Sequence, residues 1–329
     1  MSLRTAHMPE LASTGGTRVG KSSVTDGAAF RCSVDNMIGM NRFTDAEARA
    51  CRRLVQLAAS EDLGLAGDLT TDAFIPADQA GAATFVARRD GVLAGLPAVE
   101  IVVELFDLRL KLTPLKDDGD RLAAGDRIAT VRGPMRGILS AERTALNFLQ
   151  RLSGVATQTR RFVDLVADLP VKLLDTRKTT PGWRLLEKYA VRQGGGHNHR
   201  VGLYDMILIK DNHLAALVGE PDPVAAAVQR ARQHSPGVPV EVEVDTLDQL
   251  DRALACGPDM ILLDNMDLNQ LGESVRRRNA AGSKALLEAS GGVTLTTLRG
   301  IAETGVDRIS VGALTHSAVA LDIALDYGE

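Results

Sequence analysis

The chain has 329 residues, and its 45% hydrophobic and 24% charged residues give a globular composition that can bury a core of normal size. The net charge of −4 argues against a broad nucleic-acid-binding surface. The three cysteines, Cys32, Cys51 and Cys256, are far apart and indicate neither a disulfide framework nor a structural zinc site. No apolar run is long enough to span a bilayer and the N-terminus lacks a secretory pattern, so we expect no membrane association and a cytoplasmic location.

The first 40 residues are rich in Ser, Thr, Gly and Ala and show no sustained periodicity. We predict that residues 1–40 form a disordered extension. Met37 and Met40 directly precede the first convincing helix, so a translation start assigned too early is the alternative. That helix begins after Thr44, because Thr44 and Glu47 have the spacing of a capping box.

Residues 41–147 are predicted to form a small N-terminal α/β domain. Short β-rich runs between Gly, Pro and Asp turn signals predict three strands, at Ala83–Ala87, Leu108–Leu112 and Ile128–Val131. Pro97–Phe106 has the pattern of a helix between two of them.

A long helix starting near Ser140 leads into a second domain, predicted over residues 148–310, in which short apolar strands alternate with helices. The predicted strands are Val171–Thr176, Met206–Lys210, Val240–Asp245, Met260–Asp264, Ala285–Ala289 and Arg308–Val311. Helices are expected at about 222–234, 246–256, 267–281 and 294–304. This alternation indicates a parallel sheet with crossover helices, and about six repeats favour an α/β barrel over an open doubly wound sheet, which is the alternative. We expect residues 311–329 to form a C-terminal helix that packs back on the N-terminal domain.

Polar residues follow almost every apolar strand of the predicted barrel. They are Arg177 and Lys178, then Lys210, Asp211 and Asn212, then Asp264 and Asn265, then Ser290, Gly291 and Gly292, and finally Gly312. The carboxyl ends of parallel barrel strands form one rim, and this rim carries the chemistry in such folds. Five polar strand ends in succession, with charges of both signs, therefore predict a polar site there.

The strand Val240–Asp245 alternates valines with Glu241, Glu243 and Asp245. Side chains alternate across a strand, so the valines share one face and the acids share the other. In a barrel the acids would point inward, where buried carboxylates need cations, a metal or hydrogen-bond donors. A surface edge strand with a solvated acidic face is the alternative, and it fits poorly with the apolar strands on either side.

Four cations are available to balance these acids: Arg177, Lys178, Arg200 and Lys210. Arginine offers a planar fork suited to carboxylate or phosphate, whereas lysine offers a mobile point charge. Two cations at one strand end could also belong to an ordinary surface loop. Their combination with the acidic strand favours a site for an anionic ligand.

Three glycine-containing loops could bind a ligand through their backbone. The turn Gly194–Arg200 lets amides approach closely and carries His197 and His199, although further metal ligands in a suitable pattern are lacking. Ser290–Gly292 and Gly312–Ser317 each precede a predicted helix, where amides bind phosphate. Each could instead be a plain turn with a helix cap, and their succession along the chain favours phosphate binding.

The chain resembles the quinolinate phosphoribosyltransferase family, the carboxylating nicotinate-nucleotide pyrophosphorylases of NAD synthesis, over roughly residues 44–328. The resemblance is carried by Glu61–Gly64 with Gly67–Thr71, Glu142–Asn147 with Leu152–Gly154, Asp175–Gly182, Gly194–Arg200, Ile209–His213, Glu241–Asp245, Leu262–Asn265, Glu288–Gly292 and Val311–His316. The common phosphoribosyltransferase fingerprint, a strand ending in paired acids with a Gly/Thr loop, is absent. The resemblance implies an incomplete, seven-stranded TIM-like α/β barrel plus a smaller N-terminal α/β open-faced sandwich domain.

The resemblance also implies a role for each matching site residue. Quinolinate would lie among Arg177, Lys178, His199, Arg200 and Lys210, with Arg143 entering from the second subunit of a homodimer. Phosphoribosyl pyrophosphate would contact Glu243, Asp264, Ser290, Gly291, Gly312 and His316. Mg²⁺ would be held by Glu243 and Asp264, and the catalytic residues would be Lys178, Glu243 and Asp264.

The implied reaction transfers phosphoribose from phosphoribosyl pyrophosphate to quinolinate with decarboxylation, which gives nicotinate mononucleotide, pyrophosphate and CO₂. The alternatives are a related barrel phosphoribosyltransferase acting on nicotinate or another carboxylated ring, a phosphate-binding barrel isomerase or decarboxylase, and a non-catalytic small-molecule-binding protein. A cation cluster large enough for two carboxylates favours quinolinate. This interpretation requires Arg177, Lys210, Glu243 and Asp264 to share one cavity.

Overall fold

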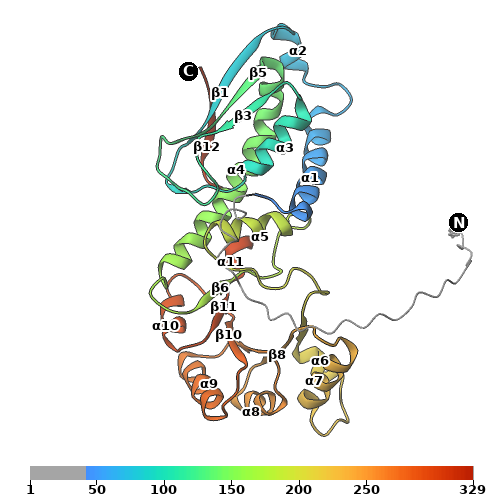
Figure 1. Ribbon diagram of the computed structural model, residues 1–329, viewed down its shortest axis with the longest axis vertical. Coiled ribbons are helices and arrows are strands. Elements are labelled where there is room, and N and C mark those ends of the chain that lie inside the picture. The colour runs from blue at the N-terminus through green and yellow to red at the C-terminus, as the bar shows by residue number, and fades with distance from the viewer. Residues whose placement is uncertain (1–41, 329) are drawn as a thin grey trace, which may run out of the picture. The chain divides into compact units, whose positions relative to one another are not determined.

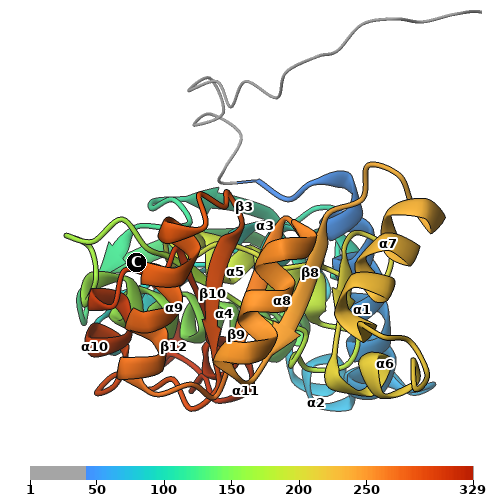
Figure 2. The same ribbon diagram turned by 90° about the horizontal axis from the view of Figure 1, so that it is seen from below.

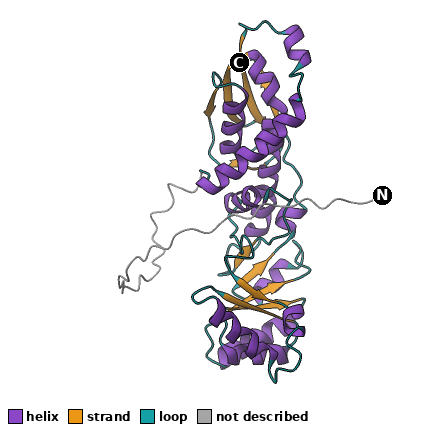
Figure 3. Cartoon of the chain, turned by 90° about the vertical axis from the view of Figure 1, so that its right-hand side faces the viewer, coloured by secondary structure: helices purple, strands orange, loops and turns teal. Residues whose placement is uncertain are grey.

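The computed structural model describes residues 42–328, so the extension predicted over residues 1–40 lies outside the described residues (Figure 1). The strands form two separate main groups (Figure 3), an antiparallel sheet built mostly from the first half of the chain and a parallel sheet from the second half. Within residues 42–328, none of the helices combines the length and apolar composition that a bilayer crossing requires.

The first helix, α1 (Asp45–Leu63), begins where the sequence predicts it. The Thr44 amide donates to Glu47 Oε2 at 2.8 Å, and the Glu47 amide donates to Thr44 Oγ1 at 3.3 Å, which completes the capping box. A short helix, α2 (Leu69–Phe74), follows and is capped by the Asp68 side chain. Cys51 and Val55 bury one face of α1 against α3.

An antiparallel sheet in the order β12-β1-β5-β3 forms the core of the N-terminal domain. Its strands are β1 (Ala80–Ala87), β3 (Lys111–Pro114), β5 (Arg127–Pro134) and β12 (Ile323–Tyr327). A smaller pair consists of β2 (Gly91–Val92) and β4 (Arg121–Leu122). The strand predicted at Leu108–Leu112 starts later, because the Asp107 carboxylate accepts the Arg109 amide at 2.9 Å and holds a turn.

Helices α3 (Leu96–Phe106) and α4 (Met135–Asp164) pack against one another and against this sheet (Figure 1). The long helix starts directly after Pro134, earlier than the predicted start near Ser140. It continues past the sheet to pack on α5 (Arg184–Gln193) of the barrel domain. The predicted domain boundary at 147/148 therefore lies inside one continuous helix.

The parallel sheet has the order β6-β11-β10-β9-β8-β7. Its strands are β6 (Lys172–Leu174), β7 (Ile207–Ile209), β8 (Val240–Val244), β9 (Met260–Asp264), β10 (Leu286–Ser290) and β11 (Arg308–Ser310). The helices between them are α6 (Asp211–Ala215), α7 (Pro223–His234), α8 (Leu247–Cys256), α9 (Leu268–Ala280) and α10 (Leu298–Glu303), and α11 (Ala313–His316) follows the last strand. Figure 2 shows α7, α8 and α9 arranged around β8, β9 and β10. The predicted strand-helix alternation and the TIM-like fold class are confirmed.

The barrel is incomplete between β6 and β7, which are the two ends of the sheet order. A single parallel bridge joins Leu174 to His197 beside β6, and the His197 amide donates to Leu173 O at 2.8 Å. This bridge occupies the position where a seventh strand would stand. It explains why the sequence shows six clear strands in a fold with seven strand positions.

The C-terminal helix predicted over residues 311–329 is wrong. After the short helix α11, the chain forms β12, which pairs antiparallel with β1 and so returns to the N-terminal sheet. Ile323 and Leu325 are buried, whereas the residues between and after them are more exposed. This period of two favours a strand over a helix. The connection is fixed on α4, because the Leu321 amide donates to Gln150 O at 2.9 Å.

Candidate functional site

A cavity of about 500 Å³ lies at the carboxyl ends of the barrel strands. Its lining residues are Thr176, Arg177, Lys178, His199, Arg200, Leu208, Lys210, Glu243, Leu262, Asp264, Asn265, Glu288, Ser290, Gly291, Gly292 and Ser310. The four residues required to share one cavity, Arg177, Lys210, Glu243 and Asp264, are all in this set. Opposite charges from separate strands thus meet at one mouth.

The cationic part of the cavity comes from Arg177, Lys178, Arg200 and Lys210. Burial lowers the pKa of Arg200, and the nearby charge of Arg177 lowers it further. Nε of Arg177 is buried and has no hydrogen-bond partner among residues 42–328. Two neighbouring guanidinium groups, one with an unused donor, favour an anionic ligand between them.

The acidic part comes from Glu243 at the end of β8 and Asp264 at the end of β9, two paired strands. Glu243 forms an ion pair with Lys210. Asp264 accepts a hydrogen bond from Asn265 Nδ2 at 2.8 Å. The acids and the cations therefore belong to the same cavity, and both carboxylates are only partly buried.

The loop after β10 requires glycine at one position. Gly291 has φ +97°, and a Cβ there would lie 2.1 Å from Asn265 Oδ1 and 3.1 Å from the Asn265 amide nitrogen. Asn265 itself has φ +54°, and its amide donates to Ser290 O at 2.9 Å. The ends of β9 and β10 are thus interlocked beside Asp264.

Gly312 and His316 do not line the cavity, but they adjoin Lys178, which does. A Cβ on Gly312 would lie 3.0 Å from His316 Nε2 and 3.1 Å from Lys178 Cδ. The Lys178 carbonyl accepts a hydrogen bond from Thr315 Oγ1 at 2.9 Å. The last loop of the barrel is therefore held against the segment that follows β6.

Arg143 does not reach this cavity within its own chain. It lies on α4 with an exposed side chain, and it is not a lining residue of the cavity. Arg143 is predicted to contact the substrate in the site of a second subunit, and its exposed position is compatible with that prediction.

A larger hollow of about 780 Å³ lies over α1, α3 and β3, away from the strand ends. It combines Arg52 and Lys111 with Glu100 and Glu104. Arg52 Nη2 already binds Glu104 Oε2 at 2.8 Å. The barrel cavity has the unpaired donor and the convergent charges, so it is the better candidate for an active site.

Two family models account for most of the chain. Residues 155–326 match the model described as quinolinate phosphoribosyl transferase, C-terminal domain, and residues 68–153 match the corresponding N-terminal domain. The chain belongs to the quinolinate phosphoribosyltransferase family.

Individual members of this family are similar to the chain over most of its length. A carboxylating nicotinate-nucleotide pyrophosphorylase of Mycobacterium leprae is 46% identical over 285 residues, which cover 86% of this chain and 99% of that protein. A decarboxylating quinolinate phosphoribosyltransferase of Nicotiana glauca is 42% identical over 289 residues, which cover 83% and 81%. The structure of the Francisella tularensis nicotinate-nucleotide pyrophosphorylase superposes with a TM-score of 0.81 at 39% identity, covering 88% of this chain and 99% of that one.

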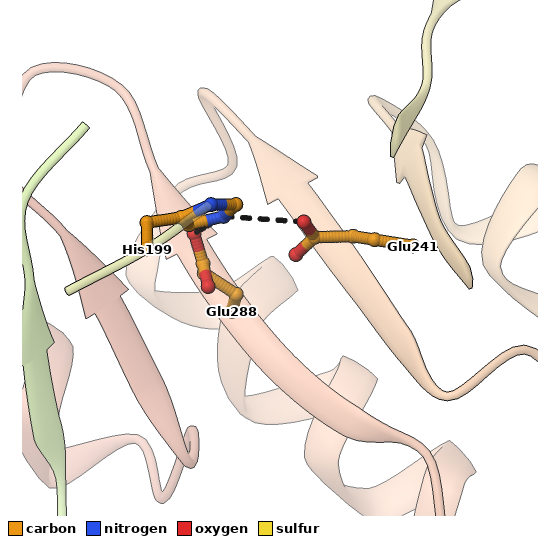
Figure 4. A group of neighbouring side chains, drawn as sticks. All are labelled: His199, Glu241 and Glu288. Atoms are coloured by element: carbon orange, nitrogen blue, oxygen red, sulfur yellow. Dashed lines mark ion pairs between the residues drawn. The ribbon is translucent and has the colours of Figure 1, made fainter. Parts of the chain in front are cut away.

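His199 lines the cavity of this family member, yet both of its ring nitrogens face protein groups. Nε2 lies 3.2 Å from Glu241 Oε2 and 3.2 Å from Glu288 Oε1 (Figure 4), and Nδ1 accepts the Arg200 amide at 2.7 Å. Burial lowers the pKa of His199, whereas the interactions of its ring with Glu241 and Glu288 raise it.

A buried network beneath the cavity holds the 197–200 segment. Asp175 forms an ion pair with Lys188, and its Oδ1 also accepts the His199 amide at 2.9 Å. Lys188 Nζ donates to His199 O at 2.9 Å, and Asn198 Nδ2 donates to Asp175 Oδ2 at 2.7 Å. Burial raises the pKa of Asp175 and lowers that of Lys188. In each residue this effect of burial exceeds the opposite effect of the partner's charge.

The residues assigned to the site omit Glu288, Thr176 and Ser310, which line the cavity, and Asn265 was expected only as a polar strand end. They also omit Glu241, although the alternation of β8 predicts its inward direction. Glu288 had a detectable signal: it is an acid inside the apolar strand β10. Asp245 was expected to face inward with Glu241 and Glu243, but it is exposed because β8 ends at Val244.

Proposed function

We propose that the chain transfers phosphoribose from phosphoribosyl pyrophosphate to quinolinate and decarboxylates the product to nicotinate mononucleotide, with release of pyrophosphate and CO₂. The observation that carries this proposal is the cavity at the ends of the parallel strands, in which Arg177, Lys178, Arg200 and Lys210 lie opposite Glu243 and Asp264 and which Glu288 also lines. The cations suit a ring dianion, and the carboxylates suit the ribose and metal side of the second substrate. Family membership gives the same reaction.

Quinolinate binding is assigned to the cationic part of the cavity. Arg177, Arg200, Lys178 and Lys210 would neutralise its two carboxylates and aim its ring nitrogen at ribose C1. Arg177 supplies a buried donor with no partner among the described residues. Lys210 is paired with Glu243, so its ammonium lies between the two halves of the cavity.

Glu243 and Asp264 are proposed to bind Mg²⁺. Both carboxylates line the cavity, they come from adjacent strands, and carboxylate oxygens are the ligands that Mg²⁺ prefers. These residues therefore fit the ion. When bound, Mg²⁺ would neutralise charge on the oxygens of the departing pyrophosphate.

The same carboxylates have a role in the transfer step. Positive charge develops at ribose C1 and the ring oxygen as pyrophosphate leaves, and Glu243 and Asp264 would stabilise it electrostatically. The new pyridinium nitrogen then acts as an electron sink, so the adjacent carboxylate can leave as CO₂. Lys178 is assigned the closest contact with the reacting centre, because it lies between the cationic group and the Gly312 loop.

One assay tests the reaction. We expect Mg²⁺-dependent pyrophosphate release with quinolinate plus phosphoribosyl pyrophosphate, and little or none when nicotinate replaces quinolinate, because the cavity gathers enough cations for two carboxylates. Equal turnover with nicotinate would support the related phosphoribosyltransferase instead. Turnover without phosphoribosyl pyrophosphate would support a barrel isomerase or decarboxylase.

Gly291 is proposed to contact phosphoribosyl pyrophosphate, and Gly291→Ala should raise the KM for that substrate at least about tenfold. A Cβ at this position would collide with Asn265 and disturb the loop beside Asp264. Steady-state kinetics with each substrate varied in turn would measure the effect.

Gly282→Ala is a matched control, because Gly282 also has a positive φ, +62°, a Cβ added to it would have no atom within 4 Å, and it does not line the cavity. We expect its KM for phosphoribosyl pyrophosphate to stay within about threefold of wild type. Equal effects of the two substitutions would mean that backbone conformation, and not the contact with Asn265, explains the loss.

A homodimer in which Arg143 completes the partner's site is also proposed. Arg143 is exposed on α4 and absent from the cavity of its own chain, so it is free to act on a neighbouring subunit. Ser290, Gly312 and His316 are proposed, like Gly291, to contact phosphoribosyl pyrophosphate. A cytoplasmic location stays a prediction from the sequence.

A further inference from the structure

Three side chains from different parts of the barrel meet at the wall of the cavity, which His199 and Glu288 line (Figure 4). His199 comes from the loop after α5, Glu241 from β8 and Glu288 from β10. Glu241 and Glu288 are fully buried, and the His199 Nε2 lies 3.2 Å from an oxygen of each. Burial of two carboxylates costs several kcal/mol unless cations or donors compensate it.

The available partners of these carboxylates are few. Among residues 42–328, Glu241 forms an ion pair with His199, and Glu288 forms ion pairs with His199 and with Arg308, whose Nε lies 3.0 Å from Oε2. Burial raises the pKa of Glu241, as does the nearby charge of Glu288. The four carboxylate oxygens are buried and have no hydrogen-bond partner of good geometry among these residues, and His199 Nε2 is the nitrogen that both carboxylates face at 3.2 Å.

The second ring nitrogen has the opposite requirement. Nδ1 of His199 accepts the Arg200 amide at 2.7 Å, so a proton on Nδ1 would face another donor. The two carboxylates favour a second proton on the ring, but that proton would lie on Nδ1 and point at the Arg200 N–H. We therefore take the ring as neutral, with its single proton on Nε2. The Nδ1 contact also argues against a metal ion among the three side chains, since a metal on Nε2 would require the proton to move to Nδ1.

We propose that Glu241 and Glu288 are positioning residues that share the Nε2 proton of His199, and that the oriented imidazole holds the Arg200 backbone through Nδ1. The Arg200 guanidinium starts from this restrained backbone and is held at its far end by Nη1, which donates to Met206 O at 3.2 Å. Asp175 holds the His199 amide from the other side, so the backbone on both sides of the His199 side chain is restrained. His199 then contributes to quinolinate binding mainly through Arg200, with neither ring nitrogen free to bind the substrate. This inference rests on the proposed function for its kinetic test.

Glu288→Gln and Glu241→Gln test the arrangement kinetically. Each neutral amide weakens the hold on Nε2 and brings a new donor toward it, so we expect the KM for quinolinate to rise at least about tenfold while the KM for phosphoribosyl pyrophosphate stays within about twofold. A merely structural loss would reduce the active fraction and change neither KM. Glu303→Gln, at an exposed glutamate on α10, is the matched control and should behave as wild type. An unchanged KM for quinolinate in both variants would overturn the proposal.

Nitrogen NMR of the imidazole tests the same arrangement without activity or substitution of the carboxylates. In ¹⁵N-histidine-labelled wild-type protein, the His199 signals, assigned by their absence in His199→Gln, should show a protonated Nε2 and an unprotonated Nδ1 at neutral pH. A protonated Nδ1 would overturn the link to Arg200. If the wild type shows no turnover of quinolinate, the proposed function fails, and the NMR result alone decides this inference.

Discussion

Lys178→Ala should lower the turnover of quinolinate with phosphoribosyl pyrophosphate at least about tenfold, which corresponds to about 1.4 kcal/mol of lost transition-state stabilisation. Lys178 lines the barrel cavity together with the proposed quinolinate contacts, and a Cβ on Gly312 would lie 3.1 Å from Lys178 Cδ, so its side chain passes beside a proposed phosphate contact. The substitution removes one positive charge from the reacting centre without opening a buried core, because the residue is exposed. Steady-state pyrophosphate release would measure the change in kcat.

Two further variants separate charge from geometry at this position. Lys178→Arg keeps the charge but replaces a mobile ammonium with a planar fork, so it should restore turnover only in part. Lys284→Ala removes an exposed lysine outside the cavity and should leave turnover within about twofold of wild type. Near-normal turnover of Lys178→Ala would remove this residue from the mechanism.

The barrel could be predicted from the sequence because its strands are short apolar runs with polar ends. The strand β9 occupies the predicted range, and β8 differs from its prediction by one residue at its end. The C-terminal strand β12 was missed because two buried residues, Ile323 and Leu325, are a weak signal and their pairing partner β1 is far away in the sequence. The position of His197 beside β6 is likewise set by a single bridge, which no local pattern predicts.

The site was predictable to the extent that strand ends must meet at one rim. Arg177, Lys210, Glu243 and Asp264 were found by this rule, and they share one cavity. What the rule could not supply is the direction of each side chain. His199 lines the cavity, and its role as a substrate contact stays a prediction. That its ring nitrogens face Glu241, Glu288 and a backbone amide depends on three segments that only the fold brings together.

Mixed dimers of two variants with low turnover should recover activity if Arg143 acts on the partner's site. Arg143→Ala removes the arginine and leaves the barrel intact, whereas Lys178→Ala disables the barrel and leaves the arginine intact. In a mixed dimer, one site combines the intact barrel with the intact Arg143 of the other subunit, and the second site lacks both groups. Mixed dimers isolated by two different affinity tags should therefore show about half the wild-type turnover per dimer.

The recovery distinguishes action across subunits from action within one chain. If Arg143 served its own barrel, every site of a mixed dimer would lack one essential group, and no activity would return. Arg161→Ala is the matched control, because Arg161 is an exposed arginine on the same helix α4 and donates to Gln158 within that helix. We expect that variant to be active by itself. A fully active monomer on size-exclusion chromatography would rule out a shared site, because Arg143 is exposed and is not a lining residue of the cavity in its own chain.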